Sequence, residues 1–209
     1  MEKTPLSDAP KMELPTIVFA THNLNKVEEL RQMLEGYYRV QSLTDIGCHE
    51  PIVEDADTLA GNARIKARYV KDHYGLDCFA DDTGLEVDAL GGQPGVKTAR
   101  YAGEYADSAA NMNKLLKALQ EVQADQRTAR FRTSICLIQG EMEVLIEGVC
   151  EGKIAREQSG TAGFGYDPVF LPEGSSCTFA EMQPQDKHVL SHRGRAVRKM
   201  VDDLLASFD

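Results

Sequence analysis

Hydrophobic and polar residues follow two different periods along this chain, and each period predicts one kind of element. Short runs of apolar and β-branched residues are typical of buried strands, whereas apolar residues three and four positions apart indicate amphipathic helices. On this basis strands are expected at residues 16–20, 38–43, 78–80, 85–90, 131–137, 144–150 and 169–171. Helices are expected at residues 25–36, 58–75, 108–126 and 189–208.

The order of these elements predicts the fold class. Strands and helices alternate in the first half, and two long strands then follow each other around a Gln-Gly-Glu turn at 139–141, which is typical of an antiparallel hairpin. We therefore expect a single α/β domain with a mixed sheet over residues 16–209. Residues 1–15 are polar and hold three prolines, so they are expected to form a flexible arm.

Composition narrows the classes of function. The chain has 209 residues, of which 42% are hydrophobic, as in an ordinary globular protein. Its net charge of −10 argues against nucleic-acid binding, but not against a local basic pocket for a small polyphosphate. No apolar run is long enough to cross a membrane, and the N-terminal residues lack the apolar core of a secretory signal.

The cysteines favour a reducing compartment. The chain has five of them, widely spaced and without a C-x-x-C pair, so neither zinc binding nor redox chemistry is indicated. Cys78, Cys136 and Cys150 lie in apolar, strand-like runs, as expected of thiols in a core. These features predict a cytoplasmic enzyme with reduced thiols.

The junction between the first strand and the first helix carries side chains that suit a phosphate. Residues 21–26 are Thr-His-Asn-Leu-Asn-Lys, and the free N–H groups at a helix start favour an anion. Thr21, Asn23 and Lys26 would add side-chain donors. An ordinary capped helix after a strand explains the same residues, and taken alone it is the commoner case.

Two adjacent carboxylates follow the apolar run at 78–80. If the strand continues, Asp81 and Asp82 point to opposite sides, and one of them could bind Mg²⁺ or act as a base. Their apolar flanks place them at the edge of the core, where a charge needs a partner, although a solvated turn is the alternative. Glu54 and Asp55 in the preceding acidic loop could complete a cation site.

Two further segments carry candidate chemistry. Asn62 and Lys66 are four residues apart and share one helix face, which matters for function only if Asp82 lies beside them. Residues 163–168 are Gly-Phe-Gly-Tyr-Asp-Pro, and an aromatic ring between glycines suits stacking on a planar base. A glycine-rich turn that packs Phe164 into the core explains the loop equally well.

A cationic cluster lies near the expected start of the last helix, in Lys187 and the Ser-His-Arg-Gly-Arg segment at 191–195. A charged helix end is the plain explanation, but the helix dipole disfavours cations at that end. A cluster that breaks a local rule indicates function. Phosphate donors, carboxylates and a stacking aromatic together describe a pocket for a nucleoside triphosphate.

Residues 79–87, Phe-Ala-Asp-Asp-Thr-Gly-Leu-Glu-Val, with the segments at 94–96 and 99–103, resemble the signature of the inosine triphosphate pyrophosphatase family. The segments at 21–26, 62–67, 164–168 and 191–194 match that family in the same order, so the resemblance covers about residues 16–207. It implies an elongated α/β fold with a long mixed β-sheet flanked by helices, two lobes around a central cleft, and a homodimer.

The resemblance also implies an activity: Mg²⁺-dependent hydrolysis of non-standard purine nucleoside triphosphates (ITP, dITP and XTP) to the monophosphate and pyrophosphate, without nucleic-acid or membrane partners. It implies that Asp82 activates water with Lys66 near the phosphates, and that Glu54 and Asp82 bind Mg²⁺. The residues that it implies contact the substrate are Thr21, His22, Asn23, Leu24, Asn25, Lys26, Thr83, Phe164, Gly165, Tyr166, Asp167, Lys187, His192 and Arg193.

The family pattern assigns Lys187, His192 and Arg193 to the 6-oxo edge of the purine. Side chains that only donate, such as Lys187 and Arg193, would favour a 6-oxo group over the amino group of adenine. The sequence departs from the pattern in three places: His22 stands where Gly or Asn is common, Ala60-Gly61 replaces a helix glutamate, and Tyr166 replaces Trp.

Two other functions compete with this interpretation. A Maf-like pyrophosphatase would act on modified pyrimidine triphosphates, and the Phe164 loop and the cluster at 191–194 speak against it. A non-catalytic nucleotide-binding module belongs to another class. Asp81, Asp82 and Glu54 speak against that, because a mere binder has no need of a base beside a metal.

Overall fold

The structure is a computed structural model, and it describes residues 13–103 and 107–206, with side chains up to Leu204. Most of the arm that the sequence predicts at residues 1–15 lies outside the described residues.

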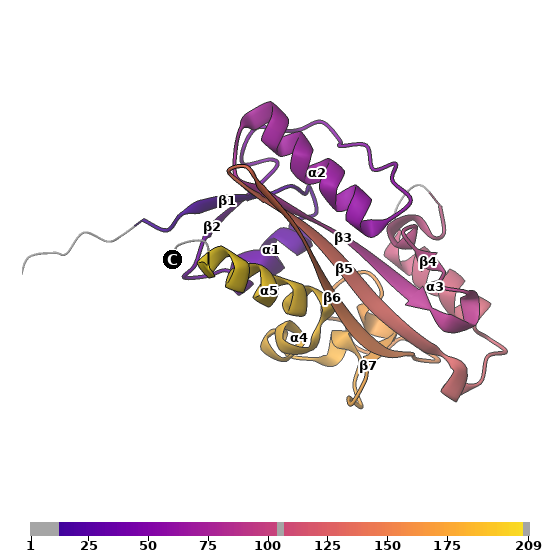
Figure 1. Cartoon of the computed structure of the whole chain (residues 1–209). Coiled ribbons are helices and arrows are strands. Elements are labelled where there is room, and N and C mark those ends of the chain that lie inside the picture. The colour runs from indigo at the N-terminus through magenta and orange to yellow at the C-terminus, as the bar shows by residue number, and fades with distance from the viewer. Residues whose placement is uncertain (1–12, 104–106, 207–209) are drawn as a thin grey trace, which may run out of the picture.

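A single mixed sheet runs through the molecule (Figure 1). Its order is β2-β1-β3-β5-β6-β7, with the short β4 paired to β3. β1 pairs in parallel with β2 and β3, and all other pairs are antiparallel, which confirms the mixed α/β fold. The strands are β1 Thr16–Phe19, β2 Arg39–Ser42, β3 Cys78–Val87, β4 Pro94–Gly95, β5 Thr128–Gln139, β6 Met142–Ile154 and β7 Phe170–Pro172.

Helices cover both faces of this sheet (Figure 1). α2 lies on one face, α1 and α5 lie on the other with α4 beside α5, and α3 lies toward the far end of the long strands. The helices are α1 Leu24–Met33, α2 Leu59–Tyr74, α3 Ser108–Ala118, α4 Pro184–Leu190 and α5 His192–Ala206. Among the described residues, no helix is long and apolar enough to be a candidate for crossing a membrane.

The pleat of β3 divides its side chains between two cores. Phe79 packs with Phe19 in the core under α1 and α5, and their ring centroids are 4.6 Å apart. Ala80 points the other way, into the core under α2. A third core around α3 holds Leu85, further along the same strand. Since β3 continues through residues 81–84, each side chain there has a face fixed by this alternation.

The structure corrects several predicted boundaries. The first helix is capped by Asn23, whose side chain accepts a hydrogen bond from the Lys26 amide, so Asn25 lies inside the helix rather than at its start. The predicted helix at 108–126 ends at Ala118, and the strand expected at 85–90 ends at Val87.

The last predicted helix, at 189–208, is two helices. Ser191 interrupts it with extended backbone angles. Its hydroxyl accepts a hydrogen bond from the Gly194 amide at 3.0 Å, and this starts α5. The chain therefore turns between α4 and α5, and the turn carries the cationic segment toward the sheet.

Candidate active site

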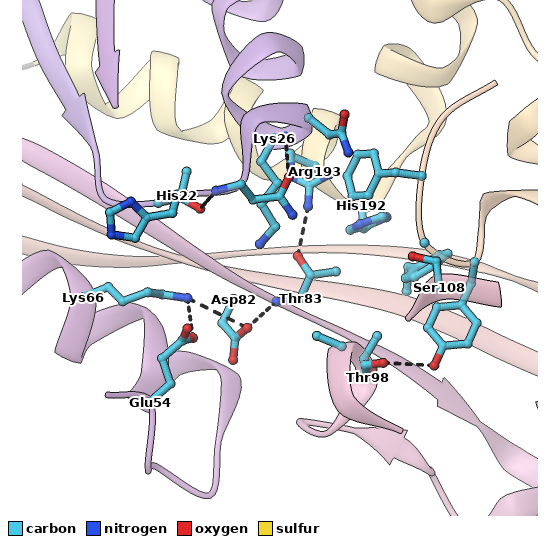
Figure 2. A pocket seen from close by; sticks show the side chains of 18 of the residues that line it. His22, Lys26, Glu54, Lys66, Asp82, Thr83, Thr98, Ser108, His192 and Arg193 are labelled. Carbon is cyan, nitrogen blue, oxygen red and sulfur yellow. Dashed lines mark hydrogen bonds and ion pairs between the residues drawn. The ribbon is translucent and has the colours of Figure 1, made fainter. Parts of the chain in front are cut away.

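One cavity of about 580 Å³ gathers side chains from widely separated parts of the chain (Figure 2). It contains every predicted site residue except Leu24: these are Thr21, His22, Asn23, Asn25, Lys26, Glu54, Lys66, Asp82, Thr83, Phe164, Gly165, Tyr166, Asp167, Lys187, His192 and Arg193. Leu24 opens the first turn of α1, is 73% exposed and does not line the cavity.

One end of the cavity is a cluster of two carboxylates and a lysine, which Figure 2 shows converging. Lys66 Nζ lies 2.6 Å from Glu54 Oε2 and 4.0 Å from Asp82 Oδ1. Asn62 donates to Asp82 Oδ2 at 3.1 Å, and its own carbonyl accepts from the Ala56 amide at 3.0 Å. Asn62 therefore ties the acidic loop to α2 and to the strand that carries Asp82.

The local sequence explains why α2 presents these side chains inward. Thr58 caps the helix and Gly75 ends it in the left-handed conformation, so the helix expected at 58–75 is confirmed. Asn62 and Lys66 lie one turn apart and are 2% and 8% exposed. Asp55, which the sequence offered as a further cation ligand, is exposed and does not line the cavity.

Asp82 is the better proton acceptor of the two adjacent carboxylates. Burial raises its pKa above the ordinary value, and Lys66, Lys26 and Asn62 only partly counteract that effect. A carboxylate with a raised pKa accepts a proton more readily at neutral pH. Its side chain keeps 16% exposure on the cavity side.

Asp81 points to the opposite face of β3 and does not line the cavity. Its carboxylate lies 2.7 Å from Lys26 Nζ and 3.0 Å from Arg193 Nε, and its side chain is 1% exposed. Burial alone would raise its pKa, but Lys26 and Arg193 outweigh that effect and hold the pKa well below its usual range. Asp81 is an enclosed ion-pair partner.

The other end of the cavity is built around the glycine-rich loop. Asp167 accepts hydrogen bonds from the Phe164 amide and from Lys187 Nζ, both at 2.8 Å. Lys187 Nζ also lies 5.1 Å from the centre of the Phe164 ring. Gly163 has a φ of +76°, and a Cβ there would collide with Asp167, so this position requires glycine.

Glu29 neutralises the two cations that approach this end, and sequence reasoning missed it. It lies 2.6 Å from Arg193 Nη1 and 3.4 Å from Lys187 Nζ, and it is 8% exposed. Its pKa is lowered, because the two cations outweigh the opposing effect of burial. The one sequence signal for a buried charge was that Glu29 directly precedes Leu30 and follows Val27 by two positions, and both of these apolar residues face the core.

The cationic cluster that the sequence places near the start of the last helix is divided between α4 and α5, and carboxylates balance it. Lys187 lies in the last turn of α4, where the dipole favours it, and Arg193 is balanced by Glu29 and Asp81. Both still line the cavity, and Arg193 also donates to the Thr83 hydroxyl at 3.2 Å.

His192 contributes an unsatisfied nitrogen to the same end. The ring is 4% exposed and stacks on Phe131, with centroids 4.6 Å apart. Burial, followed by Arg193 and Lys187, lowers its pKa well below the ordinary value, so the ring is neutral. Among the side chains that the structure describes, Nδ1 is one of two buried polar atoms without a hydrogen-bond partner. A ligand could satisfy it.

Several lining residues carry no local sequence signal of function. They come from distant segments and meet only in the fold: Ala20, Leu43, Pro51, Ile52, Thr98, Ala99, Ser108, Asn111 and Phe131. Thr98 illustrates their role. Its hydroxyl accepts from the Leu85 amide at 2.8 Å, and its carbonyl accepts from the Tyr166 hydroxyl at 2.9 Å, so it joins β3 to the glycine-rich loop.

The fold is a mixed α/β sheet, and its cavity has carboxylates and lysines at one end and an aromatic ring with polar groups at the other. Such a cavity suits a small anionic ligand that carries a planar group. The family follows from comparison with known proteins. The chain belongs to the Ham1 family, whose model matches residues 17–203.

Relatives support the assignment in sequence and in structure. A protein of Christiangramia forsetii named dITP/XTP pyrophosphatase is 51% identical over 188 residues, which cover 90% of this chain and 98% of that protein. A Porphyromonas gingivalis protein of the same name is 52% identical over 91% of this chain and 98% of its own length. The solved HAM1 protein of Coxiella burnetii superimposes with a TM-score of 0.83 at 37% identity, covering 92% of this chain and all of that one.

Proposed function

We propose that this chain hydrolyses the non-standard purine nucleoside triphosphates ITP, dITP and XTP to the nucleoside monophosphate and pyrophosphate. The observation that carries the proposal is that a single cavity joins the cluster of Glu54, Lys66 and Asp82 to the loop of Phe164 and Asp167. A polyphosphate suits the first end and a base suits the second. The names of the two bacterial relatives state this activity for those proteins.

The first end fits a magnesium ion that arrives with the triphosphate. Mg²⁺ usually keeps several waters and takes one or two carboxylates together with substrate phosphates. Glu54 and Asp82 supply two carboxylates, and among the described residues no group of three or more acidic, His or Cys side chains forms a site that could hold an ion by itself. Mg²⁺ bound there would neutralise charge on the phosphates and the pyrophosphate leaving group.

The remaining chemistry belongs to side chains of this protein. Asp82 orients a water molecule and accepts its proton as the water attacks a phosphorus atom. Lys66, beside Asp82, stabilises the negative charge that develops on the phosphate oxygens. Thr21, Asn23 and Lys26, at the start of α1, contact the phosphates, and His22, Asn25 and Thr83 complete that part of the cavity.

The second end selects the base. Phe164 stacks on the purine, with Gly165 and Tyr166 shaping the loop around it. His192 Nδ1, which has no protein partner, and the remaining N–H groups of Lys187 and Arg193 face the 6-oxo edge. Because Lys187 and Arg193 only donate, the amino group of adenine would leave donors unmatched, at about 1–3 kcal/mol each.

Three further expectations accompany this function. We infer that residues 16–209 form one catalytic domain and that two copies associate as a homodimer. We also infer a cytoplasmic location, which the free cysteines support, since Cys48, Cys78, Cys136 and Cys150 are buried thiols. Light scattering tests the dimer, and a 23.1 kDa particle at micromolar concentration would contradict it.

Pyrophosphate release from a panel of triphosphates tests the activity. With Mg²⁺ present, we expect kcat/KM for ITP, dITP and XTP to exceed that for ATP by about a hundredfold or more. Turnover confined to modified pyrimidine triphosphates would favour the Maf-like alternative. Binding of ITP without pyrophosphate release would favour the non-catalytic module.

A further inference from the structure

Six charged side chains form a buried ion cluster that runs from one end of the site to the other, and four of them also line the cavity. Consecutive contacts are 2.7 Å (Lys26 to Asp81), 3.0 Å (Asp81 to Arg193), 2.6 Å (Arg193 to Glu29), 3.4 Å (Glu29 to Lys187) and 2.8 Å (Lys187 to Asp167). Cations and carboxylates alternate, so the cluster is neutral. None of the six side chains is more than 14% exposed.

Asp81 joins the first two cations of this cluster. It bonds Lys26, which comes from the first turn of α1 at the phosphate end, and Arg193, which comes from α5 beside the Phe164 ring. Its side chain is 1% exposed and does not reach the cavity, so it has no direct access to a substrate or a metal. Whatever Asp81 contributes to the reaction must pass through its partners, which are these two cations and the Thr83 hydroxyl, a donor to Asp81 Oδ2 at 3.4 Å.

We propose that Asp81 is a positioning residue that couples the two ends of the site, so that binding of the triphosphate strengthens selection of the base. The proposal rests on the proposed function, which places phosphates at Lys26 and the base at Arg193. Asp81 divides its charge between two cations in a buried setting where ion pairs interact strongly.

The coupling follows from that division of charge. Without a ligand, the ammonium group of Lys26 is neutralised by the carboxylate of Asp81. When phosphate oxygens bind Lys26, they take over part of that neutralisation. The carboxylate of Asp81 then acts more fully on Arg193 and holds the guanidinium against β3. A guanidinium held in one orientation discriminates better between a base that accepts and a base that donates. Coupling between two ligand groups is reciprocal, so the correct base also favours phosphate binding.

Calorimetry on the full chain tests this without catalysis. In the presence of a chelator, Kd is measured for ITP, ATP, IMP and AMP. We expect the ratio of Kd for ATP to Kd for ITP to exceed the ratio for AMP to IMP by about fivefold or more, because only the triphosphates engage Lys26 fully. Equal ratios in the wild-type protein would overturn the proposal, whatever any variant does.

Variants then locate the coupling in the charge of Asp81. Asp81→Asn keeps the shape and removes the charge, so the two ratios should agree within about twofold. Asp81→Glu keeps the charge and should restore the excess. Asp77→Asn is the control, because Asp77 precedes the same strand, pairs with Lys71 and is 42% exposed; it should keep the wild-type excess. An undiminished excess in a folded Asp81→Asn protein would overturn the proposal.

A merely structural role for Asp81 has a different signature. It would weaken all four nucleotides by the same factor and leave the two ratios unchanged, which would also contradict the coupling. Failure of the proposed function would be seen separately, as an absence of pyrophosphate release from ITP by the wild-type protein with Mg²⁺.

Discussion

The two faces of β3 give the adjacent carboxylates Asp81 and Asp82 opposite environments. Asp82 faces α2 and the cavity, where Lys66 is 4.0 Å away and burial raises the pKa of the carboxyl group. Asp81 faces α1 and α5, where two cations at 3.0 Å or less hold its pKa low. A carboxylate that is accessible and incompletely paired is available for chemistry, whereas one that is enclosed and fully paired maintains the site.

The largest expected effect comes from breaking the ion pairs on the face of β3 that carries Asp81. Glu29→Gln leaves Arg193 and Lys187 buried with one carboxylate fewer, and breaking a buried ion pair from one side costs about 3 kcal/mol or more. Urea unfolding at pH 7 measures the loss. The matched control is Glu28→Gln, because Glu28 is exposed and should stay within about 0.5 kcal/mol of wild type.

The pH dependence of the same comparison has a definite sign. The pKa of Glu29 is lower in the folded protein than its ordinary value of 4.5, so its stabilisation is complete above that value. It is lost as the pH falls through the folded pKa. The difference in unfolding free energy between wild type and Glu29→Gln should therefore shrink at acid pH, and a constant difference would contradict the ion-pair account.

The next largest effect concerns Asp82, on the face of β3 that lines the cavity. Asp82→Asn keeps the shape of the side chain but removes the proton acceptor and a metal charge. We expect turnover of ITP to fall by about a hundredfold or more, as removal of a general base usually gives. The assay is pyrophosphate release with saturating Mg²⁺. Near-normal turnover would refute the role of Asp82, and Asp77→Asn should remain active.

A smaller effect concerns the close packing of α5 on β6. Gly148 on β6 lies under the first turn of α5, where a Cβ would collide with the carbonyl of His192 and the amide of Ala196. Gly148→Ala should cost about 1–3 kcal/mol of stability and weaken ITP binding by displacing His192. Glu147→Ala, on a side chain that is 54% exposed, is the control. Unchanged stability and binding in Gly148→Ala would show that the close approach is dispensable.

The smallest effect sharpens the contrast between the two faces. Because the pKa of Asp82 is raised in the folded protein, its ionised form destabilises the fold at neutral pH. Asp82→Asn should therefore slightly increase the unfolding free energy of the metal-free protein at pH 7, while Glu29→Gln decreases it. The gain should vanish below the ordinary value of 3.8, where Asp82 is protonated in both states. A loss of stability at pH 7 would reverse this account of Asp82.

Local patterns predicted much of the fold. The apolar face of α2 and its bounds near Thr58 and Gly75 are short-range features, and the structure confirms them. The hairpin of β5 and β6 could also be predicted, because the alternation of apolar and polar residues and the turn are local features. The split of the last helix at Ser191 was not, since it depends on how α4 and α5 pack.

The sequence by itself determined which residue types are present and which neighbours alternate, and therefore that Asp81 and Asp82 must face apart along a continuous strand. This alternation did not determine which of the two would be exposed to a ligand, and only the family resemblance pointed to Asp82. That was decided when α1 and α5 brought Lys26, Glu29 and Arg193 to one face of the sheet. Ion pairs between residues 55 or more positions apart depend on packing, and no local period records them.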